Sequence, residues 1–381
     1  MAAINLQAMD DFMAVNTAKY VRTKWQDIST QLQHYFFAEK LFGKAEPDEM
    51  NSALVVWDVQ YDYEDNAAVT GPYDPDVSSR KNTMTQGKMN WSFMKANYQY
   101  DYREEIFNQK PEAIVRWIDV KEHGLDNSFF SLMEKLMFGT GPTSPTQAKP
   151  PPASLQWWLP AYSSTAISAA GATNTITGSV TSDFLGMDPS GFSSVGTGGI
   201  SSAQYPGWRH RVGIYNVFSE DDAIDTILEC MDKCEFTPTR SYPQLTSEVN
   251  PRWDLLTTYS RLKLARKIAA SQNDNLRGEL ARWKDTATIR GVPLRWVPAW
   301  TNQTFGCART DGPVMGVDWQ AVKVWNRSSL NMMKSPPERD KDNHLGRWRF
   351  LDHSMQITMS TRRTSFVVTS NPSLAAITES N

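Results

Sequence analysis

Two segments that alternate between apolar and polar side chains constrain this 381-residue chain more than any other feature. Residues 54–63, through their second half, and residues 89–100 follow this alternation, which is typical of half-buried β-strands, and a polar loop separates them. Within the second segment, Trp91 and Phe93 share one face of the expected strand. The pattern predicts that residues 52–103 form one long two-stranded β-arm.

Such an arm requires a further surface, because an isolated two-stranded ribbon is only marginally stable in water. The body of the same chain and a neighbouring copy both satisfy this requirement, and the sequence leaves both open. Acidic side chains gather in the first half of the arm and basic side chains in the second half. The candidates for contacts between copies are Trp57, Asp58, Asp62, Lys88, Trp91 and Lys95.

Helical and strand-like patterns alternate along the rest of the chain. Apolar side chains at helical spacing predict helices over residues 10–42 and 109–138. Ser219 followed by three acids predicts another helix start, because the helix dipole favours negative charge there. A further helix is expected over 261–271, and strands over 253–259, 287–289, 294–298, 314–324 and 347–369. This order indicates an α+β fold rather than a regular βαβ array.

Composition argues against several classes of protein. The net charge of −3 lacks the concentrated basic field of a sequence-reading nucleic-acid binder, although it allows loose DNA contact through a local basic face. Three cysteines are too few for a disulfide framework and indicate a reducing compartment. The N-terminal residues lack the pattern of a signal peptide, and no apolar run reaches the length of a membrane span. We therefore expect no membrane partner.

The sequence carries no recognisable catalytic or cofactor-binding motif, which indicates that the protein is not an enzyme. It contains no Walker loop, no Gly-x-Ser-x-Gly elbow and no His-Glu-x-x-His pair. Cys230 and Cys234 are interpreted as two small buried side chains, because zinc requires about four ligands. Asp221 and Asp222 are adjacent, so they splay apart on a helix. We expect no catalytic residue, no cofactor and no metal.

Basic residues gather toward the C-terminal end of the chain. A surface that contacts DNA without reading its sequence favours such a patch, and the candidates for it are Arg347, Arg349, Arg362 and Arg363. Ion pairs between strands or between copies explain the same residues equally well, so this alternative stays open. For Arg209-His210-Arg211 we expect a solvated turn rather than a phosphate-binding site.

Several stretches resemble the major capsid proteins of tailed bacteriophages, in the same order along the chain. They are Thr23–Gln33, Ser271–Leu276, Pro293–Ala299, Pro313–Trp319 and Met355–Val367. The resemblance implies the HK-ninety-seven-like fold, an α+β fold that encapsulins share. It also implies a division into an N-terminal arm at 1–50, an extended β-hairpin loop at 51–105, a peripheral domain with a long spine helix at 106–160, an axial domain at 161–329, and closing peripheral strands with the C-terminus at 330–381.

The function that the resemblance implies is that of a major capsid protein, which self-assembles into the icosahedral shell of a phage around double-stranded DNA. Expected partners are further copies in hexamers and pentamers, the packaged DNA, and portal, scaffolding and decoration proteins. The expected location is the virion capsid, with assembly in the host cytoplasm. Two alternatives stay open: the shell of an encapsulin-like compartment, and a glycan-binding, tail-associated phage protein, suggested by 14 tryptophans and Ser/Gly-rich loops.

Overall fold

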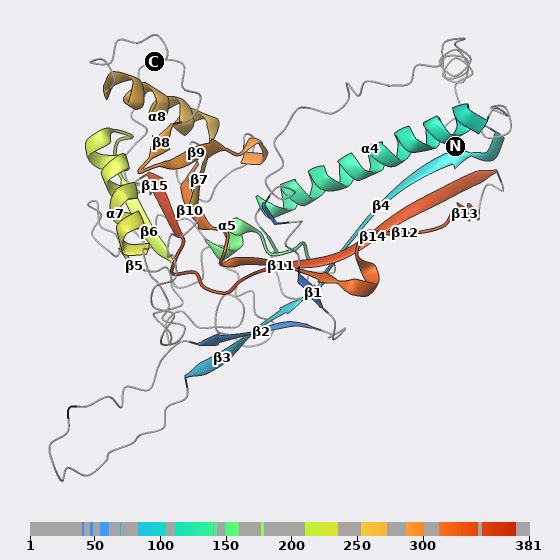
Figure 1. The fold of residues 1–381 in the computed structure, drawn as a ribbon, viewed down its shortest axis with the longest axis horizontal. Helices are drawn as coiled ribbons and strands as arrows, with labels where there is room; N and C mark the ends of the chain where they lie inside the picture. Colours follow the sequence, from blue (N-terminus) through green and yellow to red (C-terminus); the bar gives the residue numbers. More distant parts are fainter. Residues whose placement is uncertain are drawn as a thin grey trace.

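The structure is a computed structural model, and it describes residues 40–41, 46–48, 54–60, 69, 83–103, 111–139, 141–142, 149–159, 177–178, 210–234, 253–272, 287–300, 312–341 and 345–370. Within these ranges, two larger sheets and one two-stranded ribbon form the framework (Figure 1). Helix and sheet are mixed, as the sequence predicts. The helix predicted over 10–42 lies outside the described residues except at its end, where Lys40 is helical.

A six-stranded sheet is built around the longest strand, β14 (Gly346–Met359). Strand β4 (Ser92–Asp101) pairs antiparallel with the first ten residues of β14. The other edge of β14 carries, one after another, β11 (Val322–Arg327), β12 (Met333–Lys334) and β13 (Glu338–Arg339). Strand β1 (Glu46–Asp48) runs parallel to β11.

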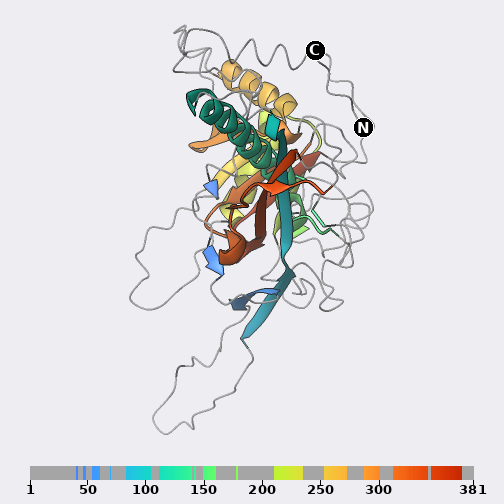
Figure 2. The same cartoon turned by 90° about the vertical axis from the view of Figure 1, so that its right-hand side faces the viewer.

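Helix α4 (Pro111–Met137) lies beside β4 and β14 in both views (Figures 1 and 2). This confirms the long helix that apolar spacing predicts, but its buried face is narrower than expected, because Leu132 is 38% exposed. Among the described side chains of α4, the buried apolar ones are four residues apart, which places them on one face: Leu125, Phe129, Met133 and Met137. At the rim of this contact, Arg349 pairs with Glu122, and Lys334 pairs with Asp126 at 3.1 Å.

A seven-stranded mixed sheet forms the second layer. In spatial order its strands are β5 (Thr177–Gly178), β6 (Arg211–Tyr215), β15 (Phe366–Ser370), β10 (Val314–Asp318), β7 (Trp253–Thr257), β9 (Val292–Trp296) and β8 (Thr288–Ile289). One face of this sheet packs against a π-helical turn, η4 (Glu220–Ile224), and two helices, α7 (Asp225–Cys234) and α8 (Tyr259–Gln272). The helices expected after Ser219 and over 261–271 are confirmed.

The two sheets are joined by the chain segments that pass from one to the other. Residues 314–324 were expected to form one strand, but they form β10 and β11, which lie in different sheets. A turn at Trp319–Ala321 separates them, in which Asp318 accepts hydrogen bonds from the Gln320 and Ala321 amides. Because Trp319 and Ala321 are also buried, the apolar run conceals this break. Likewise, the predicted strand 347–369 consists of β14 and β15, one in each sheet.

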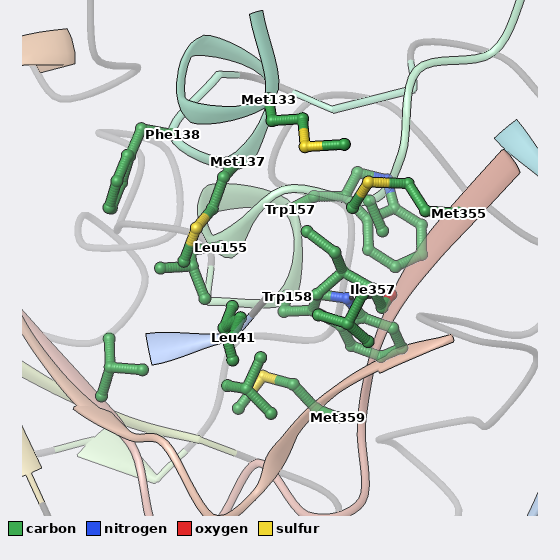
Figure 3. Packing of buried hydrophobic residues seen from close by; sticks show 14 of the residues in the cluster. Leu41, Met133, Met137, Phe138, Leu155, Trp157, Trp158, Met355, Ile357 and Met359 are labelled. Atoms are coloured by element: carbon green, nitrogen blue, oxygen red, sulfur yellow. Dashed lines mark hydrogen bonds between the residues drawn. The ribbon is translucent and has the colours of Figure 1, made fainter. Parts of the chain in front are cut away.

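A cluster of buried apolar side chains lies between the layers and includes residues from both sheets, α4, and the short helix α5 (Leu155–Trp158). Trp158 is fully buried at its centre, and its indole nitrogen donates to the Ile357 carbonyl at 3.1 Å. Figure 3 shows how α4, α5 and β14 contribute to this cluster through Met133, Met137, Leu155, Trp157, Trp158, Met355, Ile357 and Met359. The cluster therefore connects β14, the central strand of the six-stranded sheet, with α4 and α5, which are distant from it in sequence.

The long β-arm differs from the sequence prediction in its pairing. Strand β2 (Leu54–Gln60) pairs with β3 (Met84–Asn90), and β4 pairs with β14 instead of with residues 54–63. Alternation predicts that a segment is a strand but does not name its partner, and β14 offers β4 a ten-residue register. The two-stranded arm is therefore the β2–β3 hairpin, which is shorter than the predicted arm.

The faces of β4 are also the reverse of those predicted. Trp91 and Ser92 are both buried, at 4% and 1% exposure, so the alternation changes phase where β3 ends and β4 begins. Phe93 consequently points outward and is 64% exposed, while Met94 and Tyr100 point inward. A strict alternation of apolar and polar residues cannot predict that Trp91 and Ser92, two consecutive residues at a break between strands, are both buried.

The described residues include no helix that is both long and apolar enough to cross a membrane.

The first prediction concerns His353, which is 1% exposed and packs edge-on against Phe129 of α4, with ring centroids 5.5 Å apart. Burial lowers the pKa of His353 from 6.5 to about 4. Below pH 6.5, His353 is protonated in the unfolded chain but stays neutral in the folded chain until the pH approaches 4. The free energy of unfolding therefore falls as the pH drops from 6.5 toward 4. Between pH 7 and 5, the wild type should lose about 2 kcal/mol more than His353→Leu.

Denaturant unfolding at both pH values measures this difference. The matched control is His123→Leu, which removes an exposed histidine from α4 and leaves His353 in place, so the loss of stability assigned to His353 should persist. An equal pH dependence for wild type and His353→Leu would contradict the assignment of His353 as a buried neutral group.

The second prediction concerns Gly87, which lies opposite Trp57 in the β2–β3 register. A Cβ atom at Gly87 would lie 2.4 Å from the Trp57 ring, which itself packs edge-on against Trp158. Gly87→Val should therefore lower the free energy of unfolding by about 1–3 kcal/mol and speed hydrogen exchange in residues 54–60. Thr85→Val, in the same strand, is the control and should change neither; equal behaviour of the two variants would refute the packing.

Candidate assembly surfaces

The β2–β3 hairpin has one face on the body of its own chain and one face free. Its inner side chains, Val55, Trp57, Val59 and Met89, are buried in the main apolar cluster. Trp57 and Trp158 lie with ring centroids 6.0 Å apart in an edge arrangement. The surface that the arm requires is therefore supplied, on one side, by its own chain.

The outer side of the hairpin is exposed and partly apolar. Val56 is 41% exposed and Met84 is 54% exposed, with Asp58, Gln60 and Gln86 between them. Both views place the hairpin at one extreme of the described structure (Figures 1 and 2). It is therefore well placed to reach another molecule.

The candidates for contact between copies divide accordingly. Trp57 and Trp91 belong to the core of their own chain, which corrects their selection as contact residues. Asp58 and Lys95 are exposed, so they stay predicted contact residues. Asp62 and the side chain of Lys88 lie outside the described residues.

Sequence reasoning missed a second surface, the side of the six-stranded sheet that faces away from α4. We call it the outer sheet face, and define it by Phe93, Lys95, Met333, Trp348 and Phe350. Phe93 and Met333 are 64% and 55% exposed, and Trp348 stacks on Phe350 with centroids 6.3 Å apart. The sequence does contain a sign of this surface. When the alternation is counted from Ser92 as a buried residue, Phe93 becomes an apolar side chain on the same face as Lys95, Asn97 and Gln99.

The four basic candidates do not form one patch. Arg347 and Arg349 are near the start of β14, whereas Arg362 and Arg363 follow its end. The Arg347 guanidinium lies 4.4 Å from the Tyr102 ring centroid, and Arg349 pairs with Glu122 of α4. Their contacts fit the ion-pair alternative better than a free basic surface.

Arg362 is fully buried, so it does not belong to an exposed surface. Its Nη2 lies 2.9 Å from Nδ1 of His210, which is also fully buried. Burial lowers the pKa of Arg362 to about 9. The expected solvated turn at Arg209-His210-Arg211 is therefore wrong for its last two residues, because His210 is enclosed and Arg211 begins strand β6; Arg209 lies outside the described residues.

The two cysteines of α7 are buried free thiols, as predicted. Burial raises the pKa of both, that of Cys234 to about 12, so both stay protonated at neutral pH and are poor nucleophiles. In the part of the chain that the structure describes, no group of three or more His, Cys, Asp or Glu residues is arranged to hold a metal ion. Asp221 and Asp222 lie in η4, where Asp222 accepts hydrogen bonds from the Asn216 and Val217 amides at 2.8 Å.

Neither protein-family models nor curated protein sequences match the chain. Solved structures do. The capsid asymmetric unit of cyanophage A-1(L) is 10% identical over 93% of this chain and 96% of its own, with a TM-score of 0.53. The capsid of the empty GTA particle (9% identity, 96% and 99% coverage) and Microbacterium phage Oxtober96 (12%, 95% and 98%) have TM-scores of 0.49 and 0.48.

The cyanophage structure carries the comparison, since its TM-score is above 0.5. The match covers 93% of this chain and 96% of the cyanophage chain, so the similarity extends well beyond a single element. At 10% identity the match establishes the fold alone. The chain shares its fold with a phage capsid protein, as the resemblance in sequence implies.

Proposed function

We propose that this chain is the major capsid protein of a tailed bacteriophage, which assembles with copies of itself into an icosahedral shell around double-stranded DNA. The observation that carries the proposal is the fold shared with the cyanophage capsid structure over 93% of the chain. A structural rather than catalytic role agrees with this fold. The site of action is then the virion capsid, after assembly in the host cytoplasm.

The exposed apolar surfaces support self-association. Phe93, Met333 and Met84 are each more than half exposed, although burial of such side chains from water is favourable. Apolar groups that gather on an otherwise polar surface mark a protein contact. In the proposed shell, the free side of the hairpin and the outer sheet face are covered by neighbouring copies within hexamers and pentamers.

The domain division implied by the resemblance, with boundaries at 50, 105, 160 and 329, forms part of the proposal and needs one adjustment. Strand β11 (Val322–Arg327) shares a sheet with β14, and β15 (Phe366–Ser370) shares a sheet with β6 and β10. If each domain is built on one sheet, β11 belongs to the peripheral domain and β15 to the axial domain. The chain then crosses between domains at Trp319–Ala321 and at residues 360–365.

The encapsulin-like compartment is the second candidate, because it would use the same fold. Cargo separates the two: packaged DNA supports the phage shell, and a copurified protein supports the compartment. The glycan-binding alternative is not favoured, since the tryptophans that suggested it include Trp57, Trp158, Trp253 and Trp300, which are buried. Portal, scaffolding and decoration proteins stay proposed partners.

The third prediction tests self-assembly and the role of the hairpin together. The purified wild-type chain should form closed particles that sediment far faster than a 43.1 kDa monomer and appear as shells in negative stain. Replacing residues 62–82 by a short Gly-Ser turn keeps β2 and β3 but removes the tip. This variant should keep the wild-type unfolding midpoint and lose most particle yield, because the contact across copies is gone.

Two results would contradict these statements separately. A wild-type chain that stays monomeric under all assembly conditions would refute the shell function. Normal particle yield from the tip variant would refute only the role of the tip. Absorbance at 260 and 280 nm of particles isolated from the producing cells distinguishes nucleic-acid from protein cargo.

The fourth prediction concerns the outer sheet face. Phe93→Ser should leave the free energy of unfolding within about 0.5 kcal/mol of the wild type, because Phe93 is exposed in the subunit. It should nevertheless lower particle yield several-fold, measured by sedimentation, since an apolar contact between copies is lost. Asn97→Ser, on the same face of β4, is the control. A destabilised subunit, or an unchanged particle yield, would contradict the assignment.

A further inference from the structure

The two helices on the outer side of the seven-stranded sheet carry opposite charges. The stretch 220–234, which forms η4 and α7, has one lysine and the acids Glu220, Asp221, Asp222, Asp225, Glu229 and Asp232. Helix α8 has no acid and the bases Arg261, Lys263, Arg266 and Lys267. Both helices pack on the same apolar cluster, so one rigid layer presents both signs of charge.

Within the part of the chain that the structure describes, the six acids differ in whether they have a partner. Asp222 is held by backbone amides, Glu229 pairs with Lys233 at 2.7 Å, and Asp232 pairs with Arg290. Among the described residues, no ion pair involves the remaining exposed acids at the start of the helix. With Val217, which is 48% exposed, they define the acidic patch: Val217, Glu220, Asp221 and Asp225.

The basic patch lies along one side of α8. Tyr259, Lys263 and Lys267 are exposed and four residues apart, so they form a single row on the helix surface. Trp296 of β9 is 39% exposed and meets the Tyr259 ring edge-on, with centroids 5.5 Å apart. No ion pair within the described residues involves Lys263 or Lys267. The basic patch is therefore Tyr259, Lys263, Lys267 and Trp296.

Each patch is unfavourable when it stands alone. Like charges four residues apart on a helix destabilise it by a few tenths of a kcal/mol, and this applies to Lys263 with Lys267. Exposed aromatic side chains gain from burial in a contact, and Trp and Tyr are the residues that most often anchor protein interfaces. Contact between the two patches would place an apolar centre within a rim of opposite charges, which is the usual anatomy of an interface.

The relative placement of the patches is fixed by a buried contact. The guanidinium of Arg261, in the first turn of α8, is fully buried and lies 5.4 Å from the Tyr215 ring and 5.3 Å from the Phe218 ring. Phe218 directly precedes the turn that carries the acidic patch. The two charged surfaces are therefore preorganised with respect to each other, which lowers the entropy cost of docking both.

We infer that the acidic patch on η4 and α7 binds the basic patch on α8 and β9 of a second copy of this chain. In a ring of copies the contact runs head to tail, because each subunit offers one patch to each neighbour. This inference rests on the proposed self-assembly, and it adds the surfaces and the electrostatic pairing that join neighbouring subunits.

The fifth prediction is tested by charge reversal. The base-reversed variant carries Lys263→Glu and Lys267→Glu, and the acid-reversed variant carries Asp221→Lys and Asp225→Lys. Each alone should lose roughly tenfold or more in particle yield at low salt, because like charges then face each other across the contact. The variant with all four substitutions, and an equimolar mixture of the two reversed chains, should both recover assembly, since each patch again meets its opposite.

Two further variants guard against misfolding and against a general charge effect. Lysine near a helix start opposes the helix dipole, so Asp221→Asn with Asp225→Asn provides an acid-neutral variant, whose yield should fall and lose its salt dependence. Lys121→Glu with Lys135→Glu makes the same double reversal at exposed lysines of α4, outside both patches and the outer sheet face, and should assemble like the wild type. Unfolding midpoints identify any variant that fails to fold.

Wild-type yield from the base-reversed chain, or a folded four-substitution variant that does not recover, would overturn the contact. So would a base-reversed variant that forms normal shells with less DNA, which would assign the basic patch to nucleic acid. Failure of the proposed function looks different: the wild type would form open rings, sensitive to the reversals, and never close into shells.

Discussion

The packing around Trp158 is the interaction on which the rest of the structure depends. Its indole is fully buried, donates a hydrogen bond to β14 through the Ile357 carbonyl, and packs edge-on against Trp57 of the hairpin. Gln356 adds polar links from the same strand, donating to the Asn90 carbonyl at 2.6 Å and accepting from the Ala153 amide at 2.8 Å. Strand β14, the β2–β3 hairpin and α5 are thereby fixed to one another. Replacing Trp158 by alanine would lower the free energy of unfolding by about 3–5 kcal/mol, because so large a buried side chain is lost.

A rigid centre explains how the subunit can present several exposed surfaces at once. Hairpin, outer sheet face and charged helices all project from elements that the two apolar clusters hold in place. Because their geometry is set before association, less conformational entropy is lost when copies meet. The apolar groups of the outer sheet face supply burial, and the opposite charges of η4–α7 and α8 supply orientation, so the two kinds of surface serve different needs of one assembly.

The sequence predicts the elements of this fold better than their partners. The spacing of Leu125 and Phe129 predicts α4, and Gly291 between two short apolar runs predicts the β8–β9 hairpin. The pairing of β4 with β14 depends on residues some 250 positions apart, which no local pattern encodes. Trp57 and Trp91 looked like contact residues because burial in the chain's own core and burial between copies select the same side chains. The buried Arg362 looked like a surface charge because arginine is seldom enclosed.

Cryo-electron microscopy of the purified particle would reveal both the symmetry of the assembly and the contacts between its copies. We expect a closed icosahedral shell built from rings of this chain, with Phe93 and Lys267 covered by neighbouring subunits and Trp158 enclosed within each one. Particles of any other construction, in which the outer sheet face is open to solvent and copies meet elsewhere, would contradict this expectation.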